Sequence, residues 1–373
     1  MSKEQNKDQR KKNSRYFDYS LLFIVLFLIG FGLVMLYSTS AYNGQEKFQD
    51  AGYYVKKQLV ATTIGIVGMV IMSQIDYRIW KKLWLLAYVG AFGMCTLVLF
   101  IGEDIKGAKR WLSIGPLSIQ PSEVAKIAII VFLASIISQM PKRMGKFTSL
   151  IKIMLLVSPM VVVVATENLS TAIIILGIAI ALVFVSSPKY LQFILMGGAV
   201  VAFGVTFIMM ESYRAERIMV WLNPEGNVKG YQTLQGLYAI GSGGLFGKGL
   251  GASMQKLGFV PEAQNDMIFS IICEELGLFG AVSVIFLFII LIWRLMIIAN
   301  NAQDLYGALL VTGVLAHVSI QVILNIAVVT NTIPNTGISL PFISYGGTSV
   351  LFLLMEIGLA LSVSKGIKLE QEP

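Results

Sequence analysis

Charged residues are scarce in this chain of 373 residues: only 13% are Asp, Glu, Lys or Arg, and the mean hydropathy is +0.74. A soluble domain usually carries about 25% charge, so the composition indicates a protein built for lipid. Cysteine is equally scarce, and Cys95 and Cys273 lie in apolar stretches that offer neither a disulfide framework nor zinc-ligand spacing. The single histidine, His317, excludes a metal site built from several histidines.

Apolar runs of about 20 residues, the length that a bilayer-spanning helix needs, recur along the whole chain. They predict an all-α polytopic membrane protein of about ten transmembrane helices with no soluble domain attached. We expect a basic tail (1–18), one membrane domain (19–366) and a short tail (367–373), with a large extracytoplasmic loop (211–268) between helices 7 and 8. The predicted spans are 19–40, 57–75, 83–102, 122–140, 150–166, 171–187, 191–210, 269–298, 307–329 and 347–365.

The distribution of Lys and Arg orients these spans and explains the net charge of +8 without nucleic acid. Of the 29 basic residues, 17 fall in segments that this layout places in the cytoplasm, in agreement with the positive-inside rule. We therefore predict an inner-membrane protein with both termini cytoplasmic and a first span that is a retained signal anchor. Among the other 12, three lie in 102–111 and five in 211–268, where an anionic ligand outside the membrane would account for them.

The first polar motif precedes and begins the predicted fourth span. Arg110 and Trp111 come before a Gly-Pro turn, and Ser122 is a candidate N-cap for the helix that follows. Glu123 and Lys126 are three residues apart and share a helix face near the membrane boundary. Ionisable residues at such depth are candidates for function, although a structural ion pair beside an interfacial tryptophan is the alternative.

The large loop carries two arginines, Arg214 and Arg217, that share one face if the segment is helical. Two guanidinium groups grip phosphate oxygens in a forked geometry; the alternative is that they snorkel to the membrane surface. The Gly-rich part of the loop fails as a nucleotide-binding P-loop, because the positions that need Gly and Ser/Thr around Lys248 hold Ser242 and Gly249. We interpret its glycines as sites of tight turns and close packing, and expect the apolar residues of the loop to fold back on the membrane domain.

The strongest candidate for chemistry is Asp266, which follows Pro261 and stands directly before an apolar helix. Glu262 lies four residues earlier, and the pair Glu274–Glu275 lies about two turns later. A carboxylate at the mouth of a transmembrane helix has its pKa set by burial and by nearby cations, which suits a general base. The alternative is that Asp266 is only a helix N-cap.

Two further polar segments join predicted spans. At 167–171, Asn168 or Ser170 is a candidate cap for the next helix, and the alternative for the whole segment is a simple polar turn. The segment 331–349 is a polar loop broken by Pro and Gly, and such backbone at membrane depth is tolerated only where protein buries it or water reaches it. That loop predicts a lined cavity on the outer side, whereas His317 in the preceding span is interpreted as structural.

Three long motifs resemble the SEDS family (shape, elongation, division and sporulation) and carry the match across nearly the whole chain. They are KRWLSIGPLSIQPSEVAK at 109–126, the Gly-rich run through GFVPEAQNDMIFSIICEELGLFG at 241–280, and PNTGISLPFISYGGTS at 334–349. Within the family, SMQKLGFVPEA resembles the FtsW and SpoVE branches more than the RodA branch. The chain departs from the family at ENLST, where a P-D-L-G-T segment is usual, and at Gln264 and Met267 on either side of the aspartate.

The resemblance implies a peptidoglycan glycosyltransferase that joins lipid II units into glycan strands outside the cytoplasmic membrane. It assigns the essential aspartate of the family to Asp266 and the important tryptophan to Trp111. It also implies a class B penicillin-binding protein and other divisome proteins as partners, and it fits division or sporulation. The alternatives from other classes are a lipid II flippase, which a polar cavity in a ten-span protein also fits, and a non-catalytic divisome scaffold.

The expected mechanism needs a base at the acceptor hydroxyl and positive charge at the departing pyrophosphate. Asp266 is the candidate base. No covalently bound cofactor is expected, and a divalent cation (Mg²⁺ or Mn²⁺) is a candidate helper. The candidate substrate-binding residues are Arg110, Trp111, Glu123, Lys126, Arg214, Arg217, Lys248 and Glu262.

Overall fold

The computed structural model describes residues 17–105, 108–114, 117–189, 197, 218–226 and 228–367. Within these residues, nine helices are long and apolar enough to cross a membrane. They are α2 (Tyr19–Phe48), α3 (Tyr53–Gln74), α4 (Arg78–Ile101), α5 (Pro121–Gln139), α6 (Phe147–Glu167), α7 (Leu169–Ser186), α11 (Ile268–Asn300), α12 (Leu305–Val329) and α13 (Gly347–Ser364). The helical membrane architecture is thus confirmed, whereas the predicted span 191–210 lies outside the described residues apart from Gly197.

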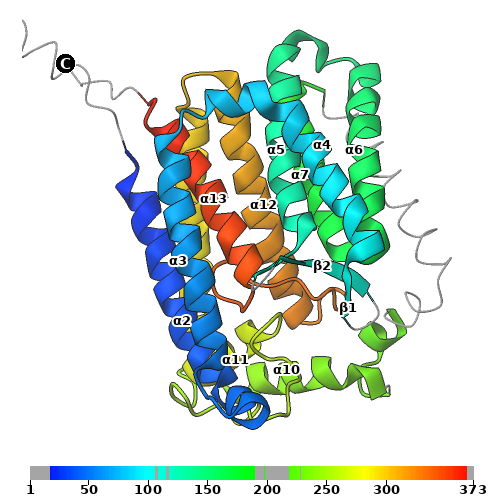
Figure 1. Cartoon of the computed structure of the whole chain (residues 1–373). Helices are drawn as coiled ribbons and strands as arrows, with labels where there is room; N and C mark the ends of the chain where they lie inside the picture. The colour runs from blue at the N-terminus through cyan, green and yellow to red at the C-terminus, as the bar shows by residue number, and fades with distance from the viewer. Residues whose placement is uncertain are drawn as a thin grey trace, which may run out of the picture.

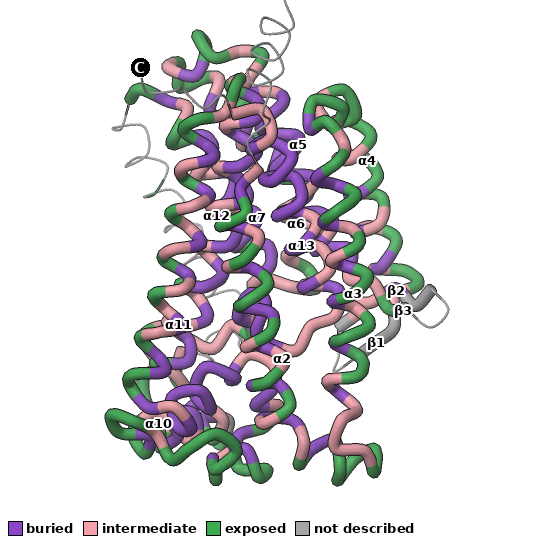
Figure 2. Tube along the Cα trace, turned by 90° about the vertical axis from the view of Figure 1, so that its left-hand side faces the viewer, coloured by how far each residue is buried: buried purple, intermediate pink, exposed green. Residues whose placement is uncertain are grey.

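The helices form a bundle in which α5 is the most enclosed member. In its most apolar window 78% of the residues are buried, against 17% for α4, so α5 is central and α4 is peripheral. Helices α4, α7 and α12 all pack against α5, while α3 packs on α13 and α11 lies against α2 and α12 (Figure 1). Figure 2 shows the exposed residues along the outer sides of α3, α4 and α11, as lipid-facing helices require.

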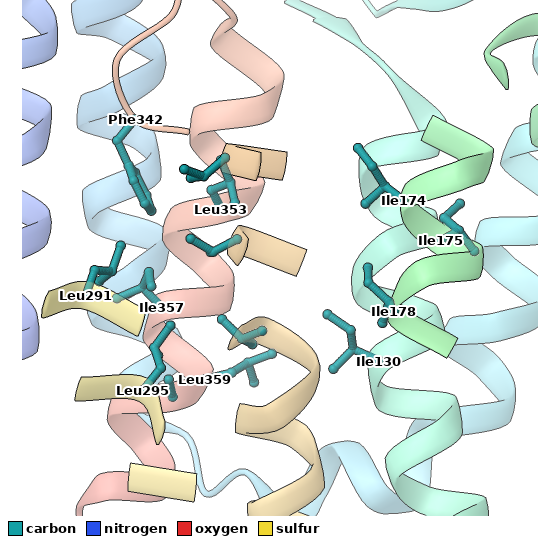
Figure 3. Packing of buried hydrophobic residues seen from close by; sticks show 14 of the residues in the cluster. Ile130, Ile174, Ile175, Ile178, Leu291, Leu295, Phe342, Leu353, Ile357 and Leu359 are labelled. Carbon is teal, nitrogen blue, oxygen red and sulfur yellow. The ribbon is translucent and has the colours of Figure 1, made fainter. Parts of the chain in front are cut away.

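Branched aliphatic side chains fill the space between these helices. Ile130 of α5 lies beside Ile178 of α7, and Leu291 and Leu295 of α11 point toward α13 (Figure 3). All four side chains are fully buried. Since lipid is as apolar as these side chains, the bundle is held by close packing more than by exclusion of water.

A small antiparallel sheet joins α4 to α5. Its strands are β1 (Glu103–Ile105), β2 (Ala108–Ile114) and β3 (Leu117–Ile119), in the order β1-β2-β3. Only a Gly-Pro turn is predicted here from the sequence, because the strands are three, seven and three residues long and show no clear alternation. The hydroxyl of Thr348 at the start of α13 donates to the carbonyl oxygen of Ser118 at 2.9 Å, which fixes β3 against the third motif.

The described part of the large loop folds back on the bundle, as predicted. It contains a short 3-10 turn (Val228–Gly230) and α10 (Tyr231–Ser242), which packs against the first turns of α11 (Figure 1). A Cβ at Gly236 would lie 2.3 Å from Cε of Met267, so α10 approaches the start of α11 closely. The indole of Trp221 donates to the carbonyl oxygen of Asn331 at 2.9 Å and ties the loop to the end of α12.

The Gly-rich segment makes tight turns and close contacts, which confirms its interpretation as a packing element. Gly247 and Gly249 have φ values of +80° and +103°. The helix α11 is broken at Gly277, which has φ +66° and ψ −165°. The amide N–H groups of Lys248 and Gly249 donate at 2.9 Å to the carbonyl oxygens of Glu274 and Glu275 that this break leaves unpaired in the helix.

One of the proposed helix caps is wrong and another is confirmed. Ser122 is not the N-cap of α5, because Pro121 occupies the first helical position and Gln120 precedes it without a side-chain cap. Proline is favoured there since its missing N–H would have no helical partner. Asn168 does cap α7, accepting from the amide of Thr171 at 3.2 Å.

Candidate functional site

Asp266 lies directly before α11 and is partly exposed. The N-cap of α11 is Met267, with no side-chain cap, so the alternative that Asp266 serves as the helix cap is wrong. Its backbone carbonyl oxygen accepts a hydrogen bond from Nδ2 of Asn325 at 2.8 Å. Asp266 therefore stands two residues before a rigid helix and outside its N-cap position.

The third motif forms a wall beside this carboxylate. A Cβ built at Gly337 would lie 4.0 Å from Oδ2 of Asp266, and Gly337 has a φ of +69°, which favours glycine. The hydroxyl of Ser170 on α7 donates to the carbonyl oxygen of Thr336 at 2.5 Å. The amide of Tyr345 donates to the carbonyl oxygen of Gln264 at 2.9 Å. The irregular loop between α12 and α13 is thus fixed to both the start of α7 and the approach to Asp266.

All three motifs therefore meet at one end of the bundle. The hydrogen bond from Thr348 joins the first motif to the third, and the bond between Tyr345 and Gln264 joins the second to the third. Side chains of α3 complete the arrangement, because Gln58 accepts from the amide of Gly346 at 3.1 Å. The sequence could not show that these distant segments converge.

Arg110 and Trp111 lie on β2, where Trp111 is partly exposed and Arg110 is exposed. A small cavity of about 20 Å³ lies next to Arg110. Its lining residues are Cys95, Val98, Leu99, Lys109, Arg110, Pro121, Ser122, Val163, Val164 and Asn168. Lys109 and Arg110 thus place positive charge beside an apolar wall.

The start of α7 links this cavity to the loop that lies beside Asp266. Asn168 lines the pocket, and Ser170, two residues later, bonds to Thr336 next to Gly337. The hydroxyl of Ser122, which also lines the pocket, is buried and has no hydrogen-bond partner among the described residues. A buried hydroxyl without a partner indicates a place for water or a polar ligand atom.

Glu123 and Lys126 form a buried ion pair inside α5, with Nζ of Lys126 2.9 Å from Oε1 of Glu123. Their side chains are only 7% and 2% exposed. The second carboxylate oxygen, Oε2 of Glu123, has no hydrogen-bond partner among the described residues. The predicted shared helix face is confirmed, and contact of either residue with substrate remains a prediction.

Lys248 and Glu262 lie in the segment that leads to Asp266. Nζ of Lys248 is 2.6 Å from Oε1 of Glu274, a carboxylate with no exposed surface. Glu262, which has a φ of +49°, accepts from Nδ2 of Asn265 at 3.1 Å. The contact found for Lys248 is therefore structural, and contact with a phosphate remains a prediction for this lysine.

A buried ion pair that was not predicted from the sequence lies next to the pair of Lys248 and Glu274. Nζ of Lys256 lies 2.7 Å from Oε1 of Glu275, and the hydroxyl of Ser38 on α2 donates to the same carboxylate. The adjacent Glu274 and Glu275 in an apolar helix were the available signal, since two buried carboxylates need two cations. His317, in contrast, pairs with Glu356 at 2.7 Å inside the bundle, in agreement with a structural role.

Two candidates, Arg214 and Arg217, fall outside the part of the chain that the structure describes. Within the described part, no three His, Cys, Asp or Glu side chains gather as ligands for a metal ion. The predicted divalent cation stays a prediction.

Comparison with known proteins decides the family. Residues 19–368 match the family of FtsW, RodA and SpoVE, described as "Cell cycle protein". The chain belongs to this family. Stage V sporulation protein E of Bacillus subtilis (strain 168) is 38% identical over 354 residues, which cover 93% of this chain and 97% of that protein.

The other similarities agree with this membership. The "Probable peptidoglycan glycosyltransferase FtsW" of Trichlorobacter lovleyi is 36% identical and covers 95% of this chain and 94% of its own. A chain solved in "Structural coordination of polymerization and crosslinking by a peptidoglycan synthase complex" superposes with a TM-score of 0.80 at 26% identity, covering 93% of this chain and 97% of that one. RodA of Thermus thermophilus superposes with a TM-score of 0.69 at 25% identity, covering 95% and 98%. The SEDS resemblance is therefore confirmed.

Proposed function

We propose that this chain is a peptidoglycan glycosyltransferase that polymerises lipid II into glycan strands at the outer face of the cytoplasmic membrane. Family membership and relatives that carry this activity in their names support the reaction class. The observation that carries the proposal is the partly exposed carboxylate of Asp266, walled by the loop at Gly337 and placed where three motifs meet. A role in cell division fits the FtsW relatives, and a role in sporulation fits the relative from Bacillus.

In the proposed mechanism Asp266 is the general base. Its carboxylate takes the proton of the acceptor sugar hydroxyl while the hydroxyl oxygen bonds to the anomeric carbon of the donor. The bond from that carbon to the pyrophosphate oxygen breaks, and the lipid pyrophosphate leaves. A positioned base contributes about 100- to 10,000-fold in rate.

Positive charge near the departing pyrophosphate is assigned first to Arg110, because it lines a pocket with an apolar wall. Arg214 and Arg217 are assigned to the same task on their sequence spacing alone. Lys126 and Lys248 already pair with buried carboxylates. In the proposal they therefore add positive charge near the substrate pyrophosphate at longer range than Arg110. Trp111 and Glu262, both partly exposed, are assigned to the sugar-peptide part of lipid II.

The proposed setting is the inner membrane, with both termini cytoplasmic and a class B penicillin-binding protein and other divisome proteins as partners. A cysteine placed at position 5 should resist a membrane-impermeant reagent in intact cells, and labelling there would contradict the topology. No step is assigned to a metal ion. Readdition of Mg²⁺ or Mn²⁺ to protein treated with a chelator tests whether a divalent cation is needed.

The deciding experiment supplies purified protein, alone and with its partner transpeptidase, with labelled lipid II in detergent and without a membrane gradient. A glycosyltransferase makes glycan strands under these conditions. A flippase makes none but moves lipid II across the bilayer of a vesicle, and a scaffold does neither. Absence of strands together with transport in vesicles would overturn the proposal.

A further inference from the structure

Helix α12 carries a line of buried polar side chains that points toward the candidate site. His317, Gln321 and Asn325 are spaced four residues apart and so share one face of the helix. They are 1%, 2% and 0% exposed. A buried polar group without a partner costs about 1–3 kcal/mol of stability. The hydrogen bonds that these side chains make near Asp266 offset that cost.

Asn325 joins two segments that are far apart in the chain. Its Nδ2 donates to the carbonyl oxygen of Asp266 at 2.8 Å and to the carbonyl oxygen of Ile338 at 2.7 Å. A carboxamide nitrogen has two N–H groups, so both are used to hold the residue before α11 against the loop that walls the site. Oδ1 of Asn325 has no hydrogen-bond partner among the described residues, so these two donated bonds are what orients the side chain.

Gln321, one turn earlier, reaches the same loop but not Asp266. Its Nε2 donates to the carbonyl oxygen of Ser339 at 3.0 Å and lies 3.4 Å from the hydroxyl of that residue. Gln321 and Asn325 thus share helix, burial and chemical type, and they differ in whether the contact includes Asp266. This difference makes Gln321 the matched control for Asn325.

We propose that Asn325 is a positioning residue for the glycosyl transfer. By holding the backbone of Asp266 against the backbone of Ile338, it fixes where the carboxylate stands relative to the wall at Gly337 and to an acceptor hydroxyl bound there. The inference rests on the proposed function, in which Asp266 is the base. A displacement of about 1 Å in such an arrangement costs up to about 100-fold in rate.

The first test replaces Asn325 by leucine, which keeps the branching and the number of heavy atoms in the side chain and removes both donors. Strand formation by the purified protein is followed while lipid II is varied. We expect kcat to fall about 10- to 100-fold while KM changes less than about threefold, since the substrate contacts remain and the base is misplaced. Gln321→Leu should lower kcat less than about threefold. Equal losses in both variants, or a normal kcat in Asn325→Leu, would overturn the positioning role.

The second test asks whether Asn325 acts through Asp266. In an Asp266→Asn background there is no base to position, so adding Asn325→Leu should lower the residual rate by less than about twofold. Full multiplication of the two losses would show that Asn325 acts elsewhere. If Asp266→Asn alone polymerises normally, the base assignment fails. If Asp266→Asn is inactive and Asn325→Leu is normal, only the positioning proposal fails.

A third variant keeps the proposal testable if leucine prevents folding. Asn325→Asp has the same shape, and a neutral carboxyl group at this buried position offers one O–H donor in place of two N–H donors. It should therefore lower kcat, by less than about 100-fold, with the same dependence on Asp266. A folded Asn325→Asp protein with unchanged kcat would also overturn the proposal.

Discussion

The two ends of α11 hold their charged residues in different ways. At the end near Asp266, Glu274 and Glu275 have no exposed surface and pair with Lys248 and Lys256 of the preceding loop. Near the other end, Arg294 of α11 pairs with a buried Asp18, but the turn from α11 to α12 relies on Asp304 and an Arg78 that is 49% exposed. The loop before α11 thus buries its charged pairs, whereas the turn after α11 leaves its ion pair facing water.

This difference follows from what each end must do. A turn between helices needs only short polar residues and water, and exposed ion pairs there contribute little. A site that handles a charged substrate at the membrane boundary needs irregular backbone, and that backbone must be held by protein contacts. The buried pairs at Glu274 and Glu275 and the hydrogen bonds of Asn325 provide those contacts.

The largest expected difference between the two ends is catalytic. Asp266→Asn keeps the size of the side chain but removes proton acceptance, so strand formation should fall about 100- to 10,000-fold. Asp304→Asn removes a carboxylate at the opposite end and should leave the rate within about threefold, as is usual for a surface residue away from the chemistry. The measurement is glycan-strand formation from labelled lipid II by each purified protein with its partner. Near-normal strands from Asp266→Asn would remove this residue from the mechanism.

The next effect is on stability. Lys256→Met leaves the buried carboxylate of Glu275 without its cation, and breaking a buried pair in this way costs about 3–5 kcal/mol. Arg78→Met breaks an exposed pair and should cost less than about 1 kcal/mol. Thermal unfolding of both variants in the same detergent compares the two ends directly. Equal shifts in Tm would show that burial does not distinguish them.

A backbone variant tests the break in α11. Gly277 has a φ of +66°, and a Cβ there would lie 2.4 Å from the amide nitrogen of Gly247. Gly277→Ala should therefore destabilise the protein by at least about 1–3 kcal/mol, the cost of holding a residue with a side chain in such a conformation. Gly93 on α4 has open space at its Cβ, so Gly93→Ala should be neutral or stabilise by about 0.5–1 kcal/mol. A normal Tm for Gly277→Ala would mean that the protein does not need the conformation of Gly277 that breaks α11.

Much of the fold could be read from hydrophobic runs, because bilayer-spanning helices leave a strong local signal. The predicted span 269–298 differs from α11 by only a residue or two at each end. Helix α2 extends to Phe48 instead of ending near residue 40, since its last turns are polar and hydropathy does not register them. The strands β1–β3 were missed because β1 and β3 are only three residues long and β2 mixes charged with apolar residues, so no clear alternation marks them.

The candidate site was predicted in its residues but not in its contacts. Asp266 and the pair Glu123–Lys126 were found because charge in apolar surroundings is conspicuous in a sequence. Lys256 and Asn325 were missed because their significance lies in partners that are 19 and 59 residues away along the chain. Such pairings depend on tertiary packing: the sequence signals that Glu274 and Glu275 need cations, but not which side chains supply them.

The smallest expected effect concerns acid stability at the end opposite Asp266. Burial alone would raise the pKa of Asp304, but hydrogen bonds from the Gly307 amide, the Tyr77 hydroxyl and Arg78 outweigh it, so its pKa lies below the ordinary value. A carboxyl group with a lowered pKa in the folded state stabilises the protein above the unfolded pKa of about 3.9. That contribution is lost as the pH falls through the lower, folded pKa.

Asp304→Asn should therefore be less stable than the unmodified protein at pH 7, by less than about 1 kcal/mol because the pair is partly exposed. The difference should shrink as the pH is lowered from about 5 toward 2, since the unmodified protein then protonates Asp304 and loses the same contribution. The measurement is Tm against pH for both proteins in one detergent. A difference that grows in acid would reverse the sign of the pKa shift. A difference that stays constant would show that Asp304 holds α12 to the turn at Tyr77 by packing alone, and that its charge does not contribute to stability.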